Sequence, residues 1–243
     1  MTDILKIFPR YFEVKKFYCT ILNKWRNLFG SRRNFIYQLN PISRVFGLDR
    51  GQPIDRYYIE EFLHRQSYDI KGCVMEIGDS SYTNKFGGKK VILSEVLHAV
   101  EGNPQATIVG DLATGDGIPK NLFDCIILTQ TFIFIYGVHA AVANSYSALK
   151  SGGVLLATFP GISQISRYDM ERWGDYWRFT DLSAQRLFGD VFGDENISVE
   201  THGNVLVACA SLHGLAAEEL TLDELNHHDP DYQVLITVRA VKK

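Results

Sequence analysis

The sequence predicts an α/β protein with a mostly parallel, seven-stranded sheet, helices on both faces and an N-terminal helical extension. A series of short apolar runs has the length of buried strands. Helical patterns separate several of these runs, as expected when right-handed crossovers join parallel strands. The last run follows a long helical stretch and a loop with Pro230, so we expect it to enter the sheet antiparallel. The seven runs are residues 73–77, 91–93, 106–109, 123–128, 154–159, 197–200 and 234–241.

Helical spacing of apolar residues predicts the segments that connect these strands. A helix over residues 53–66 begins at Pro53, which suits a first turn, and leads into the first strand. Further helices are expected over residues 140–149, 182–192 and 205–220. Twelve residues, Asp79 to Lys90, separate the first two strands, so this crossover has room for a turn or two of helix.

Residues 1–52 are expected to form a basic extension ahead of a domain over residues 53–243. Apolar side chains in steps of three and four mark one face of a helix over residues 4–28, and basic residues occupy the opposite face. Residues 31–52 show no clear period and indicate a loop. The helix can pack on the chain's own acidic body, or residues 1–30 can dock on an anionic membrane surface or an acidic partner.

The composition favours a globular cytoplasmic protein, peripheral to a membrane if the extension docks there. The first 50 of the 243 residues carry 10 Lys or Arg against 3 Asp or Glu, so this part has a charge of +7 and the remainder −10. An acidic body disfavours nucleic acid as a partner. Four widely spaced cysteines suit reduced thiols, and no residue pattern indicates a metal site. No apolar run reaches the length of about 18 residues that a membrane span needs.

Polar residues stand at the ends of the first four predicted strands. Glu76 closes the first strand and Glu95 closes the second, 19 positions later. An acid near that distance holds ribose hydroxyls in dinucleotide sites. Asp111 follows the third strand, and Thr129 and Gln130 end the fourth. Because parallel strands end at one edge of a sheet, these residues predict a ligand site at that edge.

Three segments resemble the class I S-adenosylmethionine-dependent methyltransferases, in particular the type 11 methyltransferase domain. They are ATIVGDL at residues 106–112, the segment from Ile118 to Asp124, and ALKSGGVLLATFPG at residues 148–161, and the similarity covers about residues 70–243. The resemblance implies a Rossmann-like methyltransferase fold and S-adenosylmethionine as cofactor. It implies the following cofactor-binding residues: Glu76, Gly78, Asp79, Glu95, Asp111, Leu112 and Thr129. In that scheme Glu95 binds the ribose and Thr129 lies beside the sulfonium.

The turn after the first strand departs from the family pattern. The family has three glycines in this turn, whereas here Gly78 is kept and Ser80 and Tyr82 replace the other two. A glycine permits positive φ and close approach of a ligand. The EIGDSSYT stretch is similar to methyltransferase-like proteins associated with surface polysaccharide and glycosyltransferase genes. If this turn bends away, the pocket is open. If Tyr82 fills it, the protein is a non-catalytic module.

A second group of functional candidates lies in residues 167–180, RYDMERWGDYWRFT. Aromatic faces and charged groups together are typical of sugar sites, and the DYWRFT part is similar to polysaccharide-linked type 11 methyltransferases. The candidate substrate-binding residues are Arg167, Tyr168, Trp173, Tyr176, Trp177 and Arg178. Asp169 and Asp175 are the candidate bases that would take a proton from an acceptor oxygen. Alternatively, Trp173, Trp177 and Phe179 are core anchors and Arg178 is a buried ion-pair partner.

These observations predict a methyltransferase that uses S-adenosylmethionine to modify a hydroxyl of a sugar, a glycan precursor or another small molecule. The alternative is a catalytically degenerate Rossmann-like module that serves as an accessory or docking subunit of a polysaccharide-synthesis system. Binding of the cofactor distinguishes the two.

Overall fold

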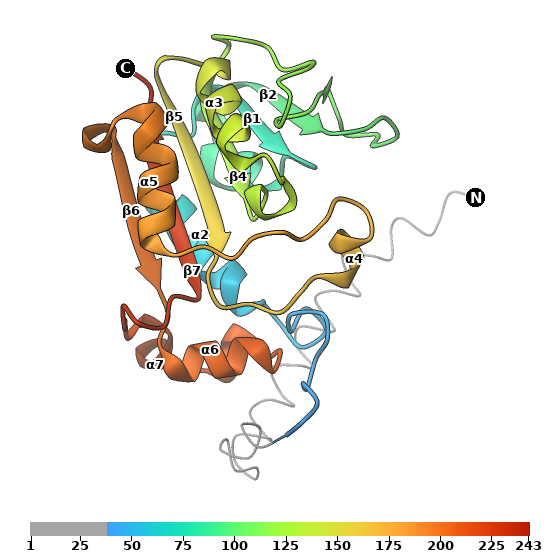
Figure 1. Cartoon of the computed structure of the whole chain (residues 1–243), viewed down its shortest axis with the longest axis vertical. Coiled ribbons are helices and arrows are strands. Elements are labelled where there is room, and N and C mark those ends of the chain that lie inside the picture. Colours follow the sequence, from blue (N-terminus) through green and yellow to red (C-terminus); the bar gives the residue numbers. More distant parts are fainter. Residues whose placement is uncertain (1–37) are drawn as a thin grey trace.

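The computed structural model describes residues 38–243, and the amphipathic helix expected over residues 4–28 lies outside them. The chain forms one seven-stranded sheet with the order β3-β2-β1-β4-β5-β7-β6 (Figure 1). The strands are β1 (Gly72–Ile77), β2 (Val91–His98), β3 (Ile108–Val109), β4 (Phe123–Thr129), β5 (Leu149–Pro160), β6 (Ile197–His202) and β7 (Leu235–Val241). All seven predicted strands are therefore present.

Five strands are parallel, and the last strand runs against its two neighbours. β1 pairs with β2 and β4, and β4 pairs with β5, all in parallel. β7 lies between β5 and β6 and is antiparallel to both. The predicted antiparallel last strand is confirmed. Because the parallel strands end at one edge, the residues after β1, β2 and β4 share that edge.

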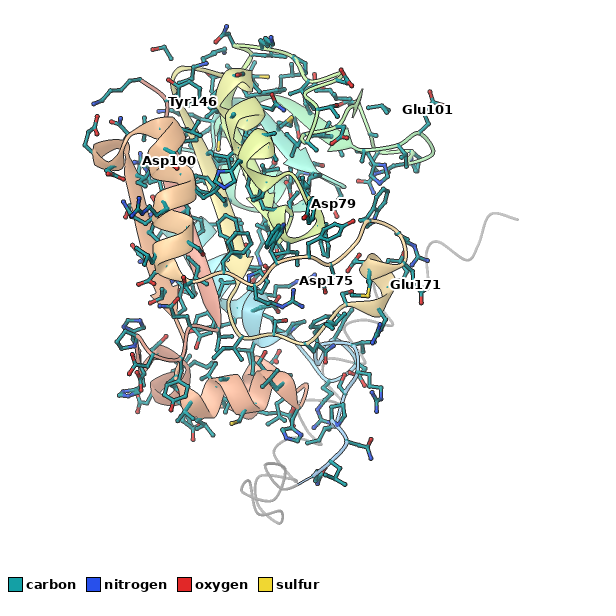
Figure 2. All side chains as sticks on the ribbon, viewed as in Figure 1. Asp79, Glu101, Tyr146, Glu171, Asp175 and Asp190 are labelled. Carbon is teal, nitrogen blue, oxygen red and sulfur yellow. The ribbon has the colours of Figure 1, made fainter. Side chains whose placement is uncertain are left out.

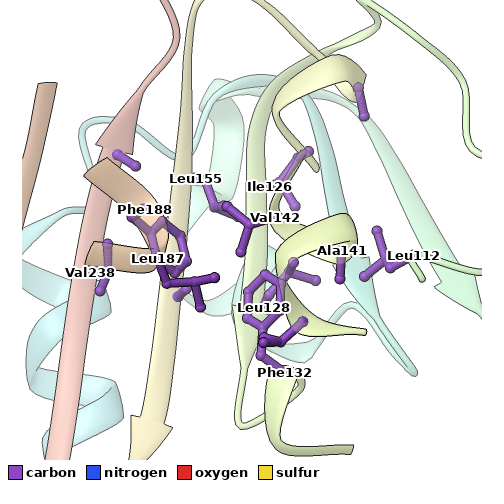
Figure 3. Close-up of a cluster of buried hydrophobic side chains, with 14 of the residues drawn as sticks. Leu112, Ile126, Leu128, Phe132, Ala141, Val142, Leu155, Leu187, Phe188 and Val238 are labelled. Atoms are coloured by element: carbon purple, nitrogen blue, oxygen red, sulfur yellow. The ribbon is translucent and has the colours of Figure 1, made fainter. Parts of the chain in front are cut away.

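Helices cover both faces of the sheet, as predicted. One face carries α3 (Val138–Ala148) and α5 (Asp181–Phe192), whose apolar side chains pack with Ile126, Leu128 and Val238 (Figure 3). The other face carries α2 (Ile54–Arg65) and α6 (Val205–Leu212), packed on Val74 and Leu156. The two layers bury most residues of the central strands β1, β4 and β5.

The helix predicted over residues 205–220 is wrong in length. α6 ends at Leu212, and the chain continues into a 3₁₀ turn (Ala217–Glu219) and then α7 (Leu222–Asn226). Gly214 has φ +72°, and a Cβ at that position would collide with the Ser43 carbonyl. The close approach of the segment around Ser43 therefore requires a glycine and ends the helix.

The segments that flank β2 in the sequence contain only short helical turns, and part of this strand is exposed to solvent. The crossover from β1 is a π-helical turn (Thr83–Gly87) followed by a 3₁₀ turn (Gly88–Lys90), which confirms the predicted short helix. Residues 99–107, between β2 and β3, form turns without a helix. Ile92 on β2 is consequently 89% exposed.

Residues 38–52 are irregular, as predicted for the described part of the 31–52 loop. They pack against the region after α6, where the amides of Ile42 and Ser43 donate to the His213 carbonyl. Arg50 donates its Nε to Glu219 Oε2 at 2.8 Å. The boundary between residues 52 and 53 stays a prediction. Among the described residues, no helix is both long and apolar enough to cross a membrane.

Candidate functional site

A cavity of about 480 Å³ lies where the carboxyl ends of β1 and β4 meet the first turns of α2. Its volume falls in the range of small-molecule sites. The β1 end contributes Glu76, Ile77 and Asp79, and the β4 end contributes Thr129 and Gln130. The remaining lining residues are Val45, Phe46, Leu48, Pro53, Asp55, Arg56, Ile59, Glu60, Ser81, Tyr82 and Lys85. The ligand edge predicted from the strand ends therefore carries a pocket.

Glu76 fixes the turn that follows β1. Its side chain is buried, and its two carboxylate oxygens accept the backbone N–H groups of Tyr82 (3.1 Å) and Thr83 (2.7 Å). Burial raises the pKa of Glu76 above its ordinary value, and the two N–H groups oppose this shift. Glu76 borders the cavity as predicted, but its oxygens are committed to the backbone of the turn.

Gly78 links the turn to β2 and leaves space beside it. Its φ is +80°, and a Cβ there would have no atom within 4 Å. Its amide donates to the Leu97 carbonyl at 2.9 Å, and its carbonyl accepts from Asn103 Nδ2 at 2.7 Å. Positive φ explains why this glycine is kept. The backbone between Ile77 and Asp79 is thus fixed and open to a ligand.

The turn after β1, which includes Asp79 and Tyr82, leaves the cavity open. Asp79, labelled in Figure 2, accepts the Ser81 amide at 2.7 Å through Oδ1. The Tyr82 ring stacks on Phe86 at 6.1 Å between centroids and packs with the core cluster beneath α2. Tyr82 forms one wall of the cavity and does not fill it.

Gln130 and Asp55 meet across the cavity. Gln130 was one of the polar strand ends that predicted the ligand edge, but neither residue was given a catalytic or cofactor-binding role. Gln130 Nε2 donates to Asp55 Oδ2 at 3.2 Å, whereas Gln130 Oε1 is buried and has no partner among the described residues. Desolvation raises the pKa of Asp55, although the bond from Gln130 opposes this. The sequence signal for Asp55 was an acid in the first turn of a helix, and the signal for Gln130 was a polar residue at the end of a strand. Both features are common in helices and strands without a functional site, so they did not indicate that the two residues meet.

Of the cofactor residues predicted at the ends of the second and third strands, Glu95 lies elsewhere than expected. Glu95 is in the middle of β2, opposite Met75, because the strand continues three residues further, to His98. Its predicted place at the strand end was therefore wrong. Asp111 follows β3 but is exposed, and its Oδ1 accepts the Ala113 amide at 2.7 Å. Leu112 is 3% exposed and packs in the core, and its place among the cofactor-binding residues stays a prediction. By contrast, Thr129 lines the cavity.

Both predicted bases are held by local contacts outside the cavity lining. The Asp175 carboxylate, whose side chain is 1% exposed, forms an ion pair with Arg178 and accepts the Ser166 amide at 3.0 Å (Figure 2). Burial raises the pKa of Asp175, but the bonds from Arg178 and Ser166 outweigh it and lower the pKa below its ordinary value. Asp169 lies in α4 (Arg167–Met170) and accepts the hydroxyl of Ser166, which caps that helix, at 2.6 Å.

The aromatic residues of this segment act largely as anchors. Trp177 Nε1 donates to the Ile135 carbonyl at 3.1 Å, and the Trp177 ring stacks on Tyr136. Trp173 contacts the His98 ring edge-to-face at 5.5 Å, at the end of β2. The segment therefore crosses from β5 to the ends of β2 and β4, and the structure favours the anchor alternative for Trp177.

The remaining substrate candidates of this segment lie at the surface. Arg167, Tyr168 and Tyr176 are exposed there. The Arg178 guanidinium is the ion-pair partner of Asp175, as in the anchor alternative. None of the six candidates lines the cavity.

No protein-family model matches the sequence, and no curated protein matches it. Solved structures do match the fold. A SAM-dependent methyltransferase from Archaeoglobus fulgidus is 13% identical, with a TM-score of 0.50 over 77% of this chain and 94% of that protein. A SAM-dependent methyltransferase from Thermotoga maritima is 16% identical, with a TM-score of 0.50 over 78% of this chain and 92% of that protein. The chain therefore has the Rossmann-like methyltransferase fold predicted from its sequence.

Proposed function

We propose that this protein is an S-adenosylmethionine-dependent methyltransferase that modifies a hydroxyl of a sugar, a glycan precursor or another small molecule. The observation that carries the proposal is the open, polar cavity at the carboxyl ends of β1 and β4, which is lined by Ile77 and Asp79 on either side of Gly78. Ligands of open α/β sheets bind at this edge. The two structural neighbours named above are described as SAM-dependent methyltransferases, which supports the same cofactor.

The charges around the cavity fit the methionine half of the cofactor. Four carboxylates, from Asp55, Glu60, Glu76 and Asp79, face two cationic side chains. Glu60 pairs with Lys85 at 2.7 Å, and Glu76 holds the turn, so Asp55 would face the sulfonium and Asp79 the ammonium group. An acidic wall suits a sulfonium and an ammonium group.

Other groups would hold the remaining parts of the cofactor. Arg56, which also lines the cavity, would bind the cofactor's carboxylate. The adenosine half would extend toward the end of β2, where His98 meets Trp173. Bound S-adenosylmethionine would supply a methyl group attached to a positively charged sulfur.

The acceptor would enter beside the segment that crosses from β5. Gln164 in this segment donates to the Arg44 carbonyl at 3.0 Å, next to the cavity-lining Val45. Tyr168 and Tyr176 are 67% and 49% exposed and could stack on the apolar face of a sugar ring. The acceptor class rests on these aromatic surfaces and on the sequence resemblance to polysaccharide-linked proteins.

Titration calorimetry with S-adenosylhomocysteine tests the proposal. We expect a one-site isotherm for the full chain and affinity at least about tenfold weaker in Gly78→Ala, because the new methyl group enters the ligand space at a strained φ. Gly88→Ala is the matched control, since Gly88 also has positive φ and open surroundings, but its chain neighbours do not line the cavity as Ile77 and Asp79 do beside Gly78. A flat trace with folded wild-type protein would refute the proposal and favour a non-catalytic module.

Docking through residues 1–30 stays a separate prediction. Deleting these residues is expected to release the protein from a membrane or partner fraction without changing the calorimetric isotherm. An unchanged fraction after the deletion would contradict docking by this segment.

A further inference from the structure

Asp55 and Gln130 form a polar pair inside the candidate cofactor cavity. The two residues are 75 positions apart, on the first turn of α2 and directly after β4. The Gln130 amide donates to Asp55 at 3.2 Å, and its oxygen is buried without a partner among the described residues. A buried acceptor without a partner carries a desolvation penalty of about 1–3 kcal/mol. A ligand that donates a hydrogen bond would remove that penalty.

The backbone holds Gln130 in a strained conformation that orients its side chain. Its φ is +51°, which costs a residue other than glycine about 1 kcal/mol or more. The backbone N–H of Gln130 donates to both the carbonyl (3.1 Å) and the hydroxyl (3.2 Å) of Thr158 on β5. The side-chain amide is therefore presented at a fixed place at the end of β4.

Asp55 differs from the other carboxylates that line the cavity. Glu76 accepts two backbone N–H groups of the turn, Glu60 pairs with Lys85, and Asp79 accepts the Ser81 amide. The side-chain donor that the described residues give Asp55 is the neutral Gln130 amide, and the backbone N–H and the charge of Arg56 also lower the Asp55 pKa without outweighing its burial. Its partly desolvated carboxylate therefore has capacity to accept another hydrogen bond or a proton.

We propose that Asp55 is the group that takes the proton of the acceptor hydroxyl, and that Gln130 is the residue that positions it. This inference rests on the proposed function and assigns the base to Asp55 in place of Asp169 and Asp175. As the acceptor oxygen bonds to the methyl carbon, the carbon–sulfur bond breaks and its electron pair stays on sulfur. The hydroxyl proton passes to the Asp55 carboxylate. Charge and atoms balance, because the sulfonium becomes a neutral thioether.

The acceptor class follows from this chemistry. An oxygen nucleophile must lose its proton during the displacement, so it benefits from a carboxylate at this position. The unpartnered Gln130 oxygen adds a second acceptor for a donor group. The pair therefore selects a hydroxylated acceptor and disfavours one without a proton to give.

Binding of two cofactor analogues tests the inference without knowledge of the acceptor. In sinefungin a carbon replaces the sulfur of the cofactor and bears an amino group in place of the transferred methyl group, whereas S-adenosylhomocysteine keeps the sulfur and has no group in the place of that methyl. If Asp55 faces the transferred group, Asp55→Asn should weaken sinefungin binding by about tenfold or more and change S-adenosylhomocysteine binding by no more than about twofold. Calorimetry on the full chain gives both constants.

Two variants serve as controls for the field and for the positioning role. Glu60→Gln removes a carboxylate from the same helix and the same cavity, but one that Lys85 already neutralises. The ratio of the sinefungin affinity to the S-adenosylhomocysteine affinity should therefore stay at the wild-type value. Gln130→Asn keeps a residue that tolerates positive φ but shortens the reach to Asp55. It should lower the ratio as Asp55→Asn does, with a smaller change.

The pH dependence separates a titrating carboxylate from a structural effect. The wild-type preference for sinefungin should fall as the pH drops through the pKa of Asp55, because the protonated acid loses its attraction for the amine. In Asp55→Asn the ratio should be lower and nearly flat. Comparison with the Glu60→Gln profile corrects for the other titratable groups around the cavity: Arg56, Glu60, Glu76, Asp79, Tyr82 and Lys85.

The outcomes distinguish this inference from the proposed function. Failure of wild-type protein to bind either analogue refutes the proposed function itself. Binding of both analogues with the same affinity ratio in Asp55→Asn and wild type, with both proteins folded by circular dichroism, overturns the assignment of Asp55. An equal loss of the preference for sinefungin in Glu60→Gln would also overturn the assignment, since the total negative charge of the cavity would then explain the effect.

Discussion

Burial and partners decide what each carboxylate of this protein does. Asp175 lies in an aromatic segment that is typical of binding sites, yet its side chain is 1% exposed and bound to Arg178 and to the Ser166 amide. A carboxylate held by a guanidinium has a lowered pKa and is a poor base at neutral pH. The side-chain partner of Asp55 is neutral and its pKa is raised, so this aspartate is better suited than Asp175 to accept a proton.

Replacing Asp175 should loosen the segment that it anchors. Asp175→Asn leaves Arg178 without its counter-charge in a partly buried place, so we expect a loss of about 2 kcal/mol in the free energy of unfolding. Urea unfolding at pH 7 measures it. Glu195→Gln, which removes an exposed ion pair with Lys243, is the control and should leave the stability unchanged.

The stability supplied by Asp175 should depend on pH with a definite sign. Its pKa is lowered in the folded protein, so the contribution is complete above its unfolded pKa of about 3.9 and is lost as the pH falls toward the folded value. The stability gap between wild type and Asp175→Asn should therefore narrow below about pH 4. A gap that stays constant over this range would contradict the ion-pair role.

At the scale of elements, β2 differs from the other parallel strands in its cover. The π-helical turn before it and the helix-free turns after it leave Ile92 at 89% exposed, whereas Leu97 on the same strand is 1% exposed. The apolar run at residues 91–93 predicted where the strand begins. Its end at His98 depends on pairing with β1, which a single-strand pattern does not contain.

Paired substitutions in β2 should show this difference. Ile92→Ala should change the free energy of unfolding by no more than about 0.5 kcal/mol, because little area leaves water at that position. Leu97→Ala should cost about 2–5 kcal/mol, as expected for a cavity in a packed core. Urea unfolding of both variants measures the values. Similar losses at both sites would mean that another surface covers Ile92 in solution.

At the scale of the whole molecule, the C-terminal strand completes the sheet. β7 pairs with β5 on one side and with β6 on the other, and the side chains of Ile236, Val238 and Ala240 are fully buried. A strand in this position contributes to both layers of the core. The fold therefore depends on the last residues of the described chain.

Truncation tests the role of β7. Removing residues 235–243 should abolish cooperative unfolding, because β6 loses its neighbour and both layers lose core side chains. Removing Lys243 alone should have no effect, since it makes an exposed ion pair. Circular dichroism during thermal unfolding reports both results. A cooperative transition in the longer deletion would contradict the central place of β7.

The sequence by itself determined the seven strands, the antiparallel last strand, the short crossover after β1 and the ligand edge at Glu76 and Thr129. Local periodicity and turn residues encode these features. Only the tertiary structure decided that Asp55 meets Gln130 across the cavity, that Asp175 is an anchor and that Glu95 lies three residues inside β2. Such partners come from pairing between residues distant in the chain, and the burial that sets their pKa values exists only once the layers have packed.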